Sequence, residues 1–83
     1  MMSDDEIVKL LVEKSREHTA VEVADLLGDI YAEGLSQGAF VVFFKRAFPA
    51  IPLPTLLEAG GWSRLTNGGL SDSEVNKLLS GWL

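Results

Sequence analysis

Residues 19–34, TAVEVADLLGDIYAEG, decide the fold that the sequence predicts. Thr19, followed three positions later by Glu22, is the capping-box signature of a helix start. The apolar residues after it recur at helical spacing and form one stripe, which consists of Val23, Leu26, Leu27, Ile30 and Tyr31. Gly34 is the residue type that ends a helix in the left-handed conformation. We therefore predict an amphipathic helix that begins after Thr19 and continues to about Glu33.

The polar face of this predicted helix carries four carboxylates at spacings of three, four and four: Glu22, Asp25, Asp29 and Glu33. No Lys or Arg occurs between Arg16 and Lys45, so nothing in this segment balances them. Like charges four residues apart cost a few tenths of a kcal/mol each, and a basic partner would recover that cost. We predict that this face binds a basic partner; the simpler alternative is a solvated polar face.

Four further segments read as helices. The first begins at Ser3 or Asp4 and runs to Glu17 or His18, and the third spans 36–48, SQGAFVVFFKRAF. A short helix runs from Pro54 to Ala59, and a last one begins at the capping box of 71–74, SDSE. Gly28, inside the predicted helix of 19–33, costs about 1 kcal/mol relative to Ala, so we expect a close helix crossing there.

These elements predict an all-α fold: one domain, residues 1–83, built as a compact irregular bundle of about five short helices without a sheet. Helix 36–48 has almost no polar face, so it should be buried and wrapped by the first, second and last helices. The segment with Pro49, Pro52 and Pro54 and the loop around Trp62 should form a lid, with a turn at Asn67-Gly68. Trp62, beside Arg64 in a Gly-rich loop, should be more exposed than Trp82, and we predict the pair Trp62 and Arg64 as a second binding site.

Charge and composition exclude several function classes. The net charge is −5, and residues 1–33 hold nine of the twelve acids but three of the seven bases. This argues against nucleic acid, which needs clustered Lys and Arg. Cysteine is absent, which removes thiol chemistry and favours a reducing compartment. The acidic N-terminus and the lack of an apolar run of about 20 residues argue against a secretory signal and a membrane span. We predict a cytoplasmic protein.

No motif predicts catalysis. GLSQG, residues 34–38, matches the G-x-S-x-G elbow of serine hydrolases, but a predicted helix precedes it where the elbow needs a strand. His18 is the only histidine, and we interpret it as a partner for the dipole at the C-terminus of the first helix. The Glu-x-x-His repeat of helical metal sites is absent. We expect no enzyme activity, no metal and no cofactor.

The function that the sequence favours is protein–protein interaction, as an adaptor, a regulatory subunit or an acidic inhibitor of a basic partner. Surplus apolar residues would also allow homo-oligomers. Two alternatives stay open. Val23, Ala24, Leu27 and Gly28 fit the first helix of a DNA-binding helix-turn-helix. GLSDS, residues 69–73, is similar to the Asp-Ser site where carrier proteins take phosphopantetheine, and Ser73 would be the modified residue.

Overall fold

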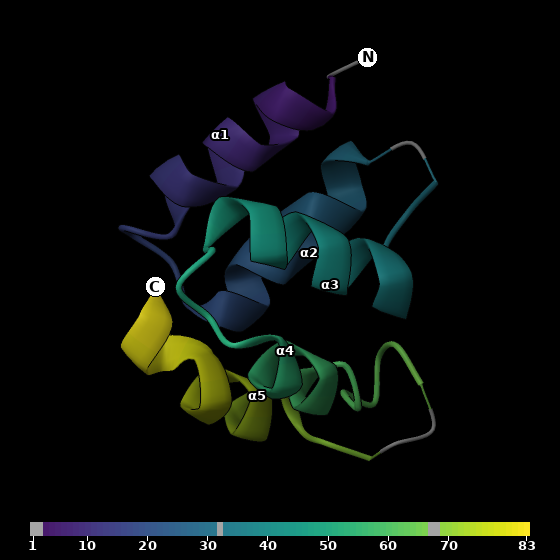
Figure 1. Cartoon of the computed structure of the whole chain (residues 1–83). Helices are drawn as coiled ribbons and strands as arrows, with labels where there is room; N and C mark the ends of the chain where they lie inside the picture. The colour runs from purple at the N-terminus through teal and green to yellow at the C-terminus, as the bar shows by residue number, and fades with distance from the viewer. Residues whose placement is uncertain (1–2, 32, 67–68) are drawn as a thin grey trace.

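The computed structural model describes residues 3–31, 33–66 and 69–83, and it contains five α-helices in those ranges (Figure 1). They are α1 (Asp4–Lys14), α2 (Ala20–Ile30), α3 (Gln37–Ala47), α4 (Leu53–Ala59) and α5 (Asp72–Leu79), followed by one 3₁₀ turn, Ser80–Trp82. Within these ranges no strand is present, only one bridge between Trp62 and Leu70. The predicted all-α bundle is confirmed, whereas the predicted turn at Asn67-Gly68 lies outside the described residues.

Local sequence signals place the helix starts. Three helices begin with a complete capping box, formed by the pairs Ser3 and Glu6, Thr19 and Glu22, and Ser71 and Glu74. Ser36 caps α3 by accepting a hydrogen bond from the Ala39 N–H. Each cap gives a partner to a backbone N–H that has none within its helix. The short polar side chains before each apolar run therefore fix the predicted starts of α1, α2, α3 and α5.

The helices form a closed ring of contacts around a single core (Figure 1). Helix α1 packs against α2 and α3, α5 packs against α2 and α4, and α4 packs against α3. The prediction that the first, second and last helices wrap α3 is correct only for the first: its main neighbours are α1 and α4. Phe40, Phe43 and Phe44 fill the inward face of α3, while Val42 on its other side is 55% exposed.

The core joins all five helices to the loop that follows α4. Its largest fully buried side chains are Trp62, Phe40, Phe44, Ile7, Leu11, Leu27, Ile51, Leu56 and Leu79. The Phe40 ring lies 4.5 Å from that of Phe44 and 6.3 Å from that of Trp62, centroid to centroid. Trp62 is 0% exposed and Trp82 is 43% exposed. The predicted order of exposure is wrong, because Trp62 belongs to the core and not to a lid.

Two helices end earlier than the sequence predicts. Helix α1 stops at Lys14, where the Ser15 hydroxyl donates to the Val12 carbonyl, so His18 lies beyond it in a turn. Helix α2 stops at Ile30, because Tyr31 adopts an extended conformation and its ring packs edge-on against Phe43 at 5.1 Å.

Gly28 and Gly34 allow the chain to turn back after α2 and to lead into α3. Gly34 is left-handed, with φ +78°, as predicted, but it lies in the turn after the helix, where its N–H donates to the Tyr31 carbonyl. Gly28 also marks a close approach, though to the segment before α3 and not to a crossing helix. A Cβ at Gly28 would lie 3.0 Å from the Cβ of Leu35.

Candidate functional site

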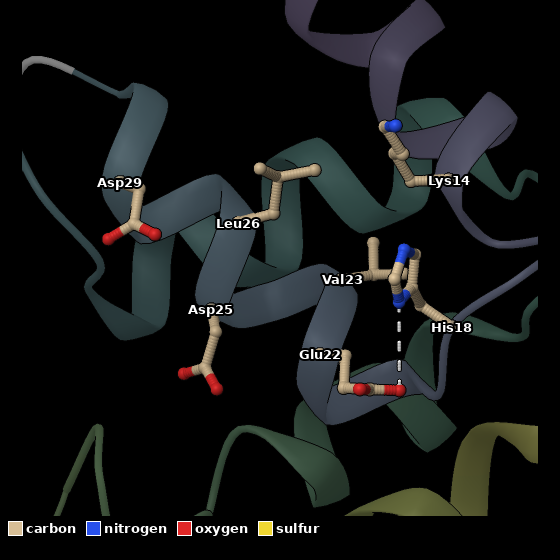
Figure 2. Close-up of a pocket in the computed structure, with 7 residues that line it drawn as sticks. All are labelled: Lys14, His18, Glu22, Val23, Asp25, Leu26 and Asp29. Carbon is tan, nitrogen blue, oxygen red and sulfur yellow. Dashed lines mark ion pairs between the residues drawn. The ribbon is translucent and has the colours of Figure 1, made fainter.

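Most of the predicted acidic face of α2 lines a hollow in the protein surface. Three of its four carboxylates, Glu22, Asp25 and Asp29, line a cavity of about 400 Å³ (Figure 2). Its apolar lining is Val23, which is fully buried, and Leu26, which is half-buried. Lys14 from α1 and His18 from the turn before α2 complete the rim. We call this site the α2 hollow.

Glu33, the fourth predicted carboxylate, does not join this site. It lies beyond the end of α2 and accepts a hydrogen bond from the Tyr31 hydroxyl at 3.4 Å. The charge of Glu33 raises the pKa of Tyr31, since ionised tyrosine would repel the carboxylate. The expected stripe of four thus becomes three, because the helix stops before its last turn.

Glu22 is engaged within its own helix start. Its Oε1 accepts the Thr19 N–H at 2.8 Å, and the same atom lies 3.8 Å from Nδ1 of His18 (Figure 2). The hydrogen bond from the Thr19 backbone is the main reason that the pKa of Glu22 is lowered. The interpretation of His18 as a dipole partner for the first helix is therefore wrong, since His18 lies four residues beyond α1 and faces Glu22.

The lowered pKa of Glu22 predicts acid sensitivity. Above its ordinary value of 4.5 the carboxylate is ionised in both states, and its full contribution to stability is present. As the pH falls from there through the lower folded-state pKa, the unfolded chain takes up the proton first and this contribution is lost. Glutamine can replace glutamate in a capping box. We therefore expect Glu22→Gln to lose less stability than the wild type between pH 7 and pH 3.

Urea unfolding followed by circular dichroism at both pH values measures this difference. Glu17→Gln is the matched control, because Glu17 lies exposed in the turn after α1 and caps no helix. Some pH dependence will remain in every variant, since the Ser3 N–H lowers the pKa of Glu6 in the same way. Equal acid sensitivity of Glu22→Gln and Glu17→Gln would show that the Thr19 capping box is not its source.

Asp25 is paired with an arginine from a distant loop. Nη1 of Arg64 lies 2.5 Å from Oδ1 of Asp25, and Nη2 lies 2.6 Å from Oδ2 of Asp72. The hydrogen bond to Asp25 raises the pKa of Arg64. The guanidinium also lies over the Trp62 ring at 5.1 Å, and Nε1 of Trp62 donates to Asp72 at 2.7 Å. The two predicted binding sites are therefore neighbours joined by Arg64, although Trp62 itself is buried.

Asp29 differs from the other two carboxylates of the hollow. It is exposed, one turn beyond Asp25 on the same face of α2 (Figure 2). In the described part of the chain no cation lies within 4 Å of the carboxylate of Asp29, and Lys14 on the rim makes no ion pair either. Asp29 is thus the carboxylate that can receive a cation without breaking an existing pair.

The polar groups that a DNA-binding α3 would use are engaged within the chain. Nε2 of Gln37 donates to the Gly60 carbonyl at 3.1 Å, and Nζ of Lys45 donates to the carbonyls of Pro49 and Ile51. Arg46 pairs with Asp5 at 2.6 Å and lies 3.8 Å from Asp4. No observation favours this alternative over the α2 hollow. Ser73, the predicted carrier site, is exposed in the first turn of α5.

Among the residues with described positions, no group of three or more His, Asp and Glu side chains could hold a metal ion. Of the helices in those same ranges, none combines the length and the apolarity that crossing a membrane requires. The sequence matches no family model, and comparisons with the curated proteins and with the solved structures give no significant match.

Proposed function

We propose that this protein is a non-enzymatic interaction module that binds a basic segment of a partner protein in the α2 hollow. Such a module would act as an adaptor, a regulatory subunit or an acidic inhibitor, in a reducing compartment such as the cytoplasm. The observation that carries the proposal is the position of Asp29. It is an exposed carboxylate without an ion pair among the described residues, and it shares a hollow with Asp25 and the half-buried Leu26.

The physical case combines charge with apolar surface. Asp25 and Asp29 are four residues apart on one helix face, and Arg64 pairs with Asp25 but not with Asp29. A bound Lys or Arg would supply the missing positive charge at Asp29. The aliphatic stem of the same side chain can lie on Leu26 while its charged head reaches the carboxylates. The excess of acids in residues 1–33 would also speed the approach of a basic partner at low salt.

Charge reversal at Asp29 tests the proposal. We expect Asp29→Lys to weaken binding of a capped hexa-arginine peptide by about tenfold, which corresponds to roughly 1.4 kcal/mol, because one attraction becomes a repulsion. Titration of the ¹⁵N-labelled protein measures the affinity. It also locates the peptide, since the amide signals of Asp25, Leu26 and Asp29 should shift most in the wild type.

Glu13→Lys is the matched control for this charge reversal. Glu13 is an exposed acid of α1 that does not line the hollow, so the substitution changes the net charge by the same amount. It should weaken binding by less than twofold if the α2 hollow is the site. Equal weakening by Asp29→Lys and Glu13→Lys would mean that the peptide responds only to net charge, and this result would overturn the proposal.

Association of the chain with itself is a separate part of the prediction. Helix α4 presents Leu53 and Leu57, four residues apart and both about half exposed, on one face. This surface is an apolar site at which a second copy could pack without using the acidic hollow. Sedimentation velocity over a range of protein concentrations measures the oligomeric state.

A further inference from the structure

Arg64 occupies a site that has the chemistry of an arginine receptor. The carboxylates of Asp25 and Asp72 accept hydrogen bonds from its two terminal nitrogens, with N–O distances of 2.5 and 2.6 Å. The Trp62 ring lies under the guanidinium, whose carbon is 5.1 Å from the ring centroid. The planar guanidinium fork suits carboxylates and aromatic faces in a way that the lysine ammonium does not. One half of this receptor, Asp25, is also a wall of the α2 hollow.

The arrangement permits exchange of one guanidinium for another. The side chains of Arg64 and Asp25 are 45% and 48% exposed, and ion pairs in such positions are weak because water competes for both charges. The base of the Arg64 loop is fixed separately: the Ser63 N–H donates to Leu70, and the Leu70 N–H donates to Gly61. Arg64 can therefore leave Asp25 by rotating its side chain, without opening the loop.

We infer that Arg64 is a built-in competitor for the α2 hollow, and that the group it excludes is an arginine of the partner. This inference rests on the proposed function. A partner guanidinium would take the place of Arg64 at Asp25 and reach Asp29, one turn away on the same face. Arg64 would keep its second carboxylate, Asp72, throughout. The internal pair thus lowers the affinity for every cationic ligand, and arginine, whose planar fork suits carboxylates, is the side chain best able to displace it.

Removal of Arg64 should tighten binding of arginine. We expect Arg64→Gln to lower the dissociation constant of capped hexa-arginine by about threefold to fivefold, which is the range that breaking an exposed ion pair provides. Hexa-lysine should gain less, because an ammonium cannot bridge the vacated carboxylates with a fork. Fluorescence anisotropy with labelled peptides, at one fixed salt concentration, measures both affinities.

Arg46→Gln is the matched control, since it also removes one positive charge from an exposed ion pair. Arg46 pairs with Asp5, which does not line the hollow. An Arg64→Gln effect no larger than that of Arg46→Gln would overturn the inference. If circular dichroism shows that Arg64→Gln fails to fold, Arg64→Lys replaces it. That variant keeps the charge, loses the fork, and should still bind hexa-arginine more tightly than Arg46→Lys does.

The failures of the two proposals can be distinguished. If Asp29→Lys and Glu13→Lys weaken hexa-arginine binding equally, the α2 hollow is not the site and the proposed function fails. If Asp29→Lys alone weakens binding and Arg64→Gln behaves like Arg46→Gln, the hollow stands and Arg64 is not a competitor.

Discussion

Replacing Trp62 with alanine is expected to lower the free energy of unfolding by about 3–5 kcal/mol, the usual cost of truncating a large buried aromatic side chain. Trp62 is fully buried against Phe40, and its indole N–H donates to Asp72 at 2.7 Å. Alanine would leave a cavity under Arg64, and Oδ1 of Asp72 would lose the indole N–H that donates to it. Urea unfolding followed by circular dichroism measures the loss.

This loss is a large part of the total free energy of unfolding of an 83-residue domain, which is about 4–12 kcal/mol by the usual value per residue. Trp82→Ala is the matched control, because Trp82 is 43% exposed in the last turn of the chain. We expect it to cost less than about 1.5 kcal/mol. Equal losses for the two variants would contradict the assignment of Trp62 to the core.

The sequence predicts much of this fold because helix starts and helix faces are local properties. Thr19 and Glu22 lie three residues apart, so their capping box is visible without knowledge of the rest of the chain. The inward face of α3 is likewise predicted correctly, because Phe40, Phe43 and Phe44 are spaced by helical periodicity. Capping residues and apolar spacing together place four of the five helices, and α4, which has no side-chain cap, is placed by its N-terminal proline.

The end of α2 is less visible in the sequence because it coincides with a tertiary contact. Gly34 is a valid stop signal and does adopt a positive φ, yet α2 ends four residues before it. The contact between Tyr31 and Phe43, twelve positions apart, coincides with the change to extended backbone at Tyr31. No periodicity within α2 contains that information, so the sequence predicts Glu33 on a helix face that ends before it.

The sequence predicts the part of the candidate site that lies within one helix, but not the contacts that distant segments make with it. The spacing of Glu22, Asp25 and Asp29 within one helix places them on one face, and they do line one hollow. Arg64 lies 39 positions from Asp25, and its neighbours in the sequence form no regular element that could indicate which way it points. Trp62 has the same difficulty: a loop residue has no periodicity from which burial can be predicted.

The role of Asn76, like that of Arg64, depends on a partner far away in the sequence. Asn76→Ala is expected to lower the free energy of unfolding by about 1–2 kcal/mol. Its Oδ1 accepts the Val21 N–H at 2.8 Å, which joins α5 to the first turn of α2 across 55 positions. A backbone N–H left without a partner at a buried residue costs about 1–3 kcal/mol. Alanine recovers up to roughly 0.7 kcal/mol of that through its higher helix propensity in α5.

Asn76→Asp separates the hydrogen bond from the packing around it. Aspartate keeps an acceptor oxygen at the same place and adds a negative charge near the N-terminus of α2, where the helix dipole favours it. It should therefore retain most of the wild-type stability, and the Val21 amide should stay protected from hydrogen exchange. In Asn76→Ala that amide should exchange faster. If both variants lose the same stability, although aspartate keeps both the acceptor oxygen and the shape of asparagine, the hydrogen bond from the Val21 N–H is not what stabilises this contact.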